Sequence, residues 1–267
     1  MKIAFSTIGC PSWDLDSVLS TAKDFGYNGV EIRGIEGQTY APSIKAFSND
    51  KIKDTVAKLD SLGLEVACLT STVCLAHHGK EHEAMTQGKA YIDLAQKLSC
   101  KYIRVMPTAV AYKDGGDINL AKDLYLTLAL YGEGRGVTPL METNGMFVDT
   151  ALLRRFMDEI ASDNIGVLWD INHPYRYNSE SIAETVAHIG KYIKHTHFKD
   201  SSIREGRVKY EIIGQGELPI ADCVNALKNM GYPGYLSLEW VKLWDKDLEE
   251  PHIIIPIYAN YIKRLLA

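Results

Sequence analysis

Four side chains that could bind a metal ion stand at or near the ends of apolar segments in the second half of the chain. Each segment has the length and composition of a buried strand, and the side chains are Glu142, Asp170, His197 and Glu239. If these are parallel strands of a barrel, their carboxyl ends lie on one face, where the four would meet. Clustered carboxylates raise one another's pKa unless a cation neutralises them. Three carboxylates and one imidazole favour Mn²⁺, with Mg²⁺, Co²⁺ or Zn²⁺ as alternatives.

The histidine of this set lies in residues 193–200, IKHTHFKD, which begin with the alternation of a strand. His195, His197 and Lys199 share one face of this strand. Residues two apart on a strand are separated by about 6.6 Å, so we expect His195 one layer deeper than His197. The alternative is a pair of core histidines. The carboxylates at the other strand ends make that alternative less favoured.

Three further residues are candidates for substrate binding. His173 follows Asp170 by three residues, so we expect it just above the metal, where it would bind or protonate substrate; a surface-loop histidine is the alternative. Lys199 could hold a carboxylate, a phosphate or a developing enolate oxygen, and a lysine at the rim is its alternative. Arg204, in the following loop, could reach an anionic group, whereas a solvated surface arginine is the other interpretation.

Short apolar runs alternate with helical patterns along the whole chain. The expected strands are residues 2–6, 29–33, 65–69, 102–106, 138–142, 165–170, 193–200 and 235–239. The expected helices are about 15–25, 48–62 (capped by Ser48 or Asp50), 80–98, 119–131, 149–160, 179–189, 220–230 and 257–266. Strict alternation indicates a parallel sheet, and eight units favour a closed (β/α)8 barrel, one domain over residues 1–267, with its site at the carboxyl ends of the strands. No dinucleotide or P-loop signature follows the first strand.

Composition excludes several classes of function. The 267 residues carry a net charge of −5 without a long basic run, so nucleic acid is not an expected partner. No apolar run is long enough to span a bilayer, and the chain opens on a strand instead of a signal peptide. Five cysteines without CxxC spacing indicate reduced thiols. We therefore expect a cytoplasmic protein without a membrane partner, and a homo-oligomer is left open.

Five motifs resemble the xylose-isomerase-like sugar isomerase/epimerase superfamily, whose members are metal-dependent TIM barrels. They are LMETNG around Glu142, VLWDINH at 167–173, HTHFKD at 195–200, IGQGE at 213–217 and GYPGYLSLEW at 231–240. The resemblance implies that the metal ligands of the superfamily correspond to Glu142, Asp170, His197 and Glu239. It also implies that the histidine of the DxxH pattern of the superfamily corresponds to His173.

The superfamily includes ketose 3-epimerases, hydroxypyruvate isomerase, inosose dehydratase, dehydroshikimate dehydratases and endonuclease IV. In ketose 3-epimerases, the sequence at the glutamate of strand five resembles EPLNRxE. In this chain, residues 143–148 read TNGMFV. A second substrate-binding glutamate is therefore missing. Endonuclease IV carries additional histidines, and this chain has RVKY at 207–210 and Met106-Pro107 in those regions. A nuclease is therefore not expected.

The expected reaction is proton transfer next to the carbonyl of a sugar or polyol-derived molecule. The metal would stabilise an enediolate, and Glu142 and Glu239 would remove and return the proton. Two bases on opposite faces give epimerisation, and one base that moves a proton between neighbouring carbons gives isomerisation. One alternative is a dehydratase of an inosose or dehydroshikimate-like substrate. A further alternative is a non-catalytic barrel that binds a sugar acid.

Overall fold

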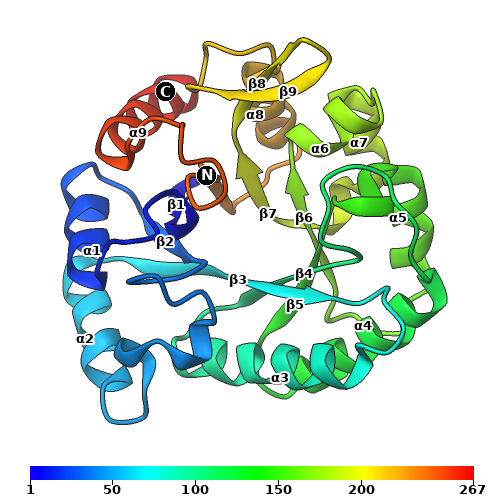
Figure 1. Ribbon diagram of the computed structural model, residues 1–267, viewed down its shortest axis with the longest axis horizontal. Helices are drawn as coiled ribbons and strands as arrows, with labels where there is room; N and C mark the ends of the chain where they lie inside the picture. The colour runs from blue at the N-terminus through cyan, green and yellow to red at the C-terminus, as the bar shows by residue number, and fades with distance from the viewer. The chain divides into compact units, whose positions relative to one another are not determined.

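Eight parallel strands form the centre of the computed structural model, which describes residues 1–267 (Figure 1). They are hydrogen-bonded in the order β1-β10-β7-β6-β5-β4-β3-β2 and close into a barrel. Their bounds are β1 Lys2–Ser6, β2 Gly29–Ile32, β3 Glu65–Cys74, β4 Tyr102–Met106, β5 Thr138–Glu142, β6 Gly166–Asp170, β7 Ile193–Phe198 and β10 Tyr235–Leu238. The (β/α)8 prediction is confirmed.

Capping residues set the bounds of several helices. Asp14 precedes the first helix and accepts the N–H of Ser17 at 2.7 Å. Gly63 ends the second in the left-handed conformation with φ of 66°, which glycine adopts without a steric penalty. The helices are α1 Leu15–Asp24, α2 Ile52–Leu62, α3 Glu81–Lys97, α4 Ile118–Glu133, α5 Thr150–Asp158, α6 Asn172–Tyr177, α7 Ile182–Ile189, α8 Ile220–Asn229 and α9 Pro251–Leu266. None is long and apolar enough to cross a membrane.

The chain divides into two compact units, and the first combines Met1–Ala67 with His197–Ala267. In this unit β1 pairs with both β2 and β10, while α1 packs on β2 and α9 packs on β1. Three aromatic side chains join these elements: Tyr27 meets Phe5 edge-on with ring centroids 5.0 Å apart and stacks on Tyr258 at 6.5 Å. Burial raises the pKa of the Tyr27 hydroxyl, which donates to the Ile255 carbonyl at 2.6 Å.

The second unit is Cys68–Thr196, in which α3, α4 and α5 lie outside β3 to β6 (Figure 1). The buried hydroxyl of Tyr125 on α4 joins two strands of this unit. It donates to the Pro139 carbonyl of β5 at 2.8 Å and accepts the N–H of Gly166 of β6 at 3.1 Å. Pro139 stands near the start of β5, a position where the missing N–H of proline is tolerated.

The structure differs from the sequence expectation at several places. The second helix starts at Ile52 without a side-chain cap, so neither Ser48 nor Asp50 caps it. The third strand continues to Cys74, beyond the expected end at Leu69. The stretch expected as a polar loop contains the hairpin of β8 Asp200–Arg204 and β9 Arg207–Glu211. The short helix α6 was not expected. Helix α9 starts at Pro251, six residues earlier than expected, because proline suits the first position of a helix.

Candidate active site

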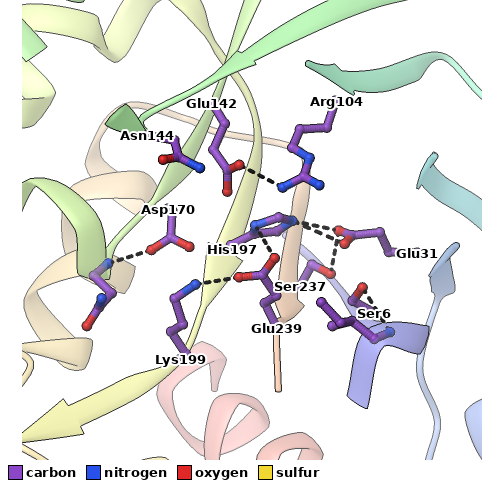
Figure 2. A network of polar contacts seen from close by, with 12 residues as sticks. Ser6, Glu31, Arg104, Glu142, Asn144, Asp170, His197, Lys199, Ser237 and Glu239 are labelled. Carbon is purple, nitrogen blue, oxygen red and sulfur yellow. Dashed lines mark hydrogen bonds and ion pairs between the residues drawn. The ribbon is translucent and has the colours of Figure 1, made fainter. Parts of the chain in front are cut away.

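Glu142, at the end of β5, is ion-paired with a buried arginine of the neighbouring strand. Arg104 of β4 lies opposite Leu140, and residues two apart on a strand share a face, so Arg104 and Glu142 lie on the same side of the sheet. Nη1 of Arg104 donates to Oε2 of Glu142 at 2.8 Å, and Nη2 donates to the Ser71 carbonyl at 2.5 Å (Figure 2). Arg104 is 3% exposed and Glu142 is 1% exposed. The guanidinium therefore fixes one carboxylate oxygen of Glu142.

Asp170, at the end of β6, fixes the position of His173. Its Oδ1 accepts the N–H groups of Asn172 at 2.9 Å and His173 at 3.3 Å, which starts α6 directly after the strand. Nδ1 of the buried His173 lies 3.1 Å from the Thr143 carbonyl, and Nε2 lies 3.6 Å from Oδ2 of Asp170. A carbonyl only accepts hydrogen bonds, so Nδ1 of His173 carries a proton. Nε2 is then the atom that faces Asp170.

His197, near the end of β7, lies between two buried glutamates of its own unit. Nε2 is 3.1 Å from both carboxylate oxygens of Glu31, and Nδ1 is 3.3 Å from Oε1 of Glu239 (Figure 2). Glu31 of β2 also accepts a hydrogen bond from Ser237 Oγ at 3.0 Å. A carboxylate on Nε2 directs Nδ1 towards a ligand, the arrangement that metal-binding histidines usually have.

Lys199 is ion-paired with Glu239 and is almost fully buried. Its ammonium contacts Oε2 of Glu239, and its side chain is 1% exposed. Tyr210 of β9 covers it, with Nζ 5.8 Å from the ring centroid. The backbone N–H of Glu239 donates to the Phe198 carbonyl at 3.0 Å, which holds this glutamate beside the end of β7. Lys199 is therefore not a solvated rim lysine.

Asp200, the last residue of the HTHFKD motif, binds the loop that carries the IGQGE motif. Its carboxylate accepts four backbone N–H groups at 2.8 to 3.2 Å, those of Ser201, Gly214, Gly216 and Leu218. A Cβ on Gly216 would stand 2.2 Å from Oδ1 of Asp200, so only glycine fits there. These two motifs therefore form one structural unit.

The remaining predicted residues have clear positions. Arg204 stands at the end of β8 with its side chain 61% exposed and its guanidinium 3.9 Å from Glu217, so the structure does not bring it to the ion pair of Lys199. Its role in binding an anion stays a prediction. His195 is fully buried, as expected for a core position.

The thiol of Cys74 has a raised pKa. Burial is the main cause, Arg104 opposes it, and Glu142 raises the pKa further, which keeps the thiol protonated.

Sequence reasoning missed Arg104 and Glu31, which contact two of the predicted residues. Both lie within strands and not after them, so the search for strand-end side chains passed over them. Their signal is a charged residue inside an otherwise apolar strand, as in YIRVM and GVEI. A buried charge needs a partner, so such a residue points to a polar site in the barrel interior.

Two buried carboxylates near the strand ends are ion-paired with buried cations, Glu142 with Arg104 and Glu239 with Lys199. Of the four predicted metal ligands, Glu142 and Asp170 lie in one unit and His197 and Glu239 lie in the other. Oxygen donors with one imidazole suit Mn²⁺, Mg²⁺ or Zn²⁺.

Comparisons with known proteins agree with this fold. Fructoselysine 3-epimerase of Shigella flexneri is 22% identical over 265 residues, which cover 95% of this chain and 94% of the relative. The structure of the probable 3-DHS dehydratase AsbF of Bacillus anthracis superposes with a TM-score of 0.77 at 15% identity, covering 98% and 99% of the two chains.

A third relative was solved with a metal ion. A xylose isomerase-like TIM barrel protein of Mycobacterium smegmatis, in complex with magnesium, superposes with a TM-score of 0.75 at 14% identity, covering 99% and 96% of the chains. The sequence model of the xylose isomerase-like TIM barrel family matches residues 19–253. This match spans most of the sequence and all eight barrel strands except the first, so the chain belongs to the xylose isomerase-like TIM barrel family.

Proposed function

We propose that this protein is a divalent-metal-dependent epimerase or isomerase of a sugar or sugar derivative. The observation that carries the proposal is the pair of buried strand-end glutamates, Glu142 and Glu239, each held by its own buried cation. Carboxylates in such positions can take a proton from carbon next to a carbonyl and return it. The named epimerase among the relatives supports the same class of reaction.

The metal would be held by the four predicted ligands, Glu142, Asp170, His197 and Glu239. When bound, it would act as a Lewis acid on the carbonyl and stabilise the negative charge of the enediolate. Glu31 would hold the His197 ring through Nε2, and Arg104 would hold one oxygen of Glu142. Mn²⁺ is the first choice of ion.

The two glutamates would act on the substrate as the proton acceptor and the proton donor. Glu142 is the last residue of β5 and Glu239 directly follows β10, and these strands are three steps apart in the strand order. In an epimerase, one glutamate removes the proton from one face of the carbon and the other delivers a proton to the opposite face. His173 would contribute Nε2 as a contact to a substrate hydroxyl, and Lys199 and Arg204 remain the proposed contacts to a more negative group.

The test is proton exchange in D₂O with metal-loaded protein and a panel of free ketoses, aldoses and inososes. We expect deuterium at one carbon next to the carbonyl of at least one sugar, together with conversion to its epimer or isomer. Protein stripped of metal should show neither. Absence of both exchange and conversion across the panel, with metal bound at one ion per chain, would contradict the proposal.

Dehydration is the second candidate, and the buried ammonium of Lys199 favours it. A hydroxyl on the carbon beyond the enolate leaves as water only if a proton reaches it. Lys199 lies next to Glu239 and carries such a proton in a site almost closed to solvent. The named dehydratase among the structural relatives agrees with this chemistry. The same D₂O experiment with inososes and dehydroshikimate would then show an unsaturated product in place of an epimer.

A further inference from the structure

Asn144 has a buried amide whose oxygen accepts no hydrogen bond from the protein. The residue is 5% exposed, and its Nδ2 lies 3.3 Å from the sulfur of Met106. A thioether is a weak acceptor, so this contact orients the amide without satisfying it. The oxygen Oδ1 has no partner. An unpaired buried acceptor is costly, which indicates a group that is completed by a ligand.

The two neighbours of Asn144 connect it to two loops at the carboxyl ends of the strands. Thr143 before it presents its carbonyl to Nδ1 of His173 on α6, at 3.1 Å. Gly145 after it donates its N–H to the carbonyl of Val110, at 3.0 Å, in the loop that follows β4. Asn144 therefore lies between α6 and the 107–117 loop, and Figure 2 shows its amide beside Glu142 and Asp170 of the same unit.

Aromatic rings extend from this position to the surface. His173 and Tyr177 are four residues apart on α6, which places them on one face of the helix, and their ring centroids are 6.1 Å apart. The Tyr177 ring contacts Tyr112 of the 107–117 loop edge-on, at 6.3 Å. His173 is buried, Tyr177 is half-buried and Tyr112 is 56% exposed. The three rings thus form a line from the buried residues to solvent.

The loop that carries Tyr112 is held by hydrogen bonds at both ends. Thr108 donates its hydroxyl to Asp114 at 2.7 Å, and the N–H of Asp117 donates to the Ala76 carbonyl at 3.0 Å. An exposed aromatic side chain on a constrained loop is well placed to bind a ligand, because little further ordering is needed when the ligand arrives.

We propose that Asn144, Tyr177 and Tyr112 form a subsite for the part of the substrate remote from the reacting carbons, and that this part is a neutral, hydroxyl-bearing chain or ring. The Asn144 oxygen can only accept, so it binds a hydroxyl and repels the oxygens of a phosphate or carboxylate. The tyrosine rings present apolar surface to the C–H groups of a sugar. This inference rests on the proposed function and deepens it: the substrate is an unphosphorylated sugar.

The experiment measures binding by calorimetry to metal-loaded protein. The ligands are the four D-2-ketohexoses and their 6-phosphates, and we expect at least one free sugar to bind more tightly than its phosphate. The variant N144A should weaken that sugar about tenfold, the loss of one hydrogen bond. N144D keeps an acceptor for the same hydroxyl and should stay within about threefold of the wild type, although it also loses the contact with Met106.

The tyrosines are tested in the same way. Y112A should weaken the free sugar about threefold to tenfold, a loss typical of one aromatic contact, while Y112F keeps the ring and should match the wild type. Phe25→Ala removes an exposed aromatic ring on the other unit and is the control, expected to change nothing.

Three results would overturn the subsite. They are tighter binding of the phosphates, equal losses in N144A and N144D, and no binding of any free sugar by the wild type. Failure of the proposed function is a separate result. If the variants weaken sugar binding as expected but no sugar exchanges its proton in D₂O, the subsite stands and the epimerase proposal falls. If exchange occurs and the phosphates bind more tightly than the free sugars, the epimerase proposal stands and the subsite falls.

Discussion

Glu142 is the last residue of β5 and Glu239 directly follows β10, and the two glutamates are held by different cations. Arg104 comes from the strand next to Glu142 and is fixed at two points by Ser71, whose carbonyl accepts from the guanidinium and whose hydroxyl donates to the Arg104 carbonyl at 2.6 Å. Lys199 directly follows β7 and contacts Glu239 through a single ammonium. One glutamate has a rigid planar partner, and the other has a point charge on a flexible stem.

The difference between the two cations separates two functions that the sequence assigned equally to both glutamates. A guanidinium keeps its charge at every physiological pH and cannot supply a proton, so Arg104 can only hold Glu142 in place as a carboxylate. An ammonium can exchange its proton, so the pair of Lys199 and Glu239 can hold a proton between them. In the proposed reaction, Glu142 would be the fixed acceptor and Glu239 would belong to the side that donates.

The largest expected effect comes from removing either carboxylate. E142Q and E239Q each keep an oxygen that can bind metal, and each should lower turnover about 10²- to 10⁴-fold, the usual contribution of a general acid or base. Single-turnover rates at saturating metal would measure this. In a two-base epimerase, one of the two variants should still exchange the substrate proton with solvent without inverting the carbon.

Near-full turnover in both variants at saturating metal would contradict the assignment of the glutamates as acid and base. They would then be ligands only, and the base would have to be His173 or Lys199. A loss of turnover confined to one variant would indicate a one-base isomerase or a dehydratase instead of an epimerase.

Metal content should distinguish the two histidines of the HTHFKD motif. We expect H197A to lose most of its bound ion, because a predicted ligand is removed. H195A should keep close to the wild-type stoichiometry while its melting temperature falls, since His195 is a fully buried core residue. Elemental analysis of the purified variants, with thermal denaturation of each, checks both statements. Equal metal content in H197A and the wild type would remove His197 from the ligand set.

Replacing Glu31 should have a smaller and more specific effect, a change in metal affinity. E31Q keeps the size of the side chain but weakens the hydrogen bond to Nε2 of His197, so the imidazole becomes a poorer and less oriented ligand. Partners of this kind typically change metal affinity about 10- to 100-fold. Titration of the stripped protein with Mn²⁺ measures it. S237A removes the hydroxyl that supports Glu31 and should give a weaker loss in the same direction. An unchanged affinity in both variants would show that Glu31 does not support the metal site.

The parts of the site that could be predicted are those set by local sequence. Asp170 and Glu239 follow apolar runs directly, and the position after a strand of a parallel barrel places them at its carboxyl face whatever the rest of the chain does. Arg104 and Glu31 depend on register: Arg104 meets Glu142 only because β4 pairs with β5 so that Arg104 lies opposite Leu140. A single sequence does not contain that information.

The elements that escaped prediction are short or polar. Helix α6 has only six residues and contains Pro174, and it starts because Asp170 accepts its first N–H groups. The β8–β9 hairpin turns at Glu205 and Gly206, both with positive φ, and a glutamate replaces the Asn or Asp that usually marks such a turn. In both places tertiary contacts decide the structure, so local propensity was not a guide.

Exchanging the two cations is the smallest change and the most direct test of the comparison. R104K keeps the charge beside Glu142 but loses the fork that reaches both Glu142 and Ser71, so we expect turnover to fall about tenfold, the effect of one charged hydrogen bond, at every pH tested. K199R keeps the charge beside Glu239, but a guanidinium cannot give up a proton. If Lys199 supplies a proton, K199R should therefore lower turnover by more than R104K does. Single-turnover rates of both variants at saturating metal would measure this. R135K, at a half-exposed ion pair with Asp93, is the control for an arginine-to-lysine change and should leave the rate unaltered. Equal losses of turnover in R104K and K199R would show that the two cations serve only as charges.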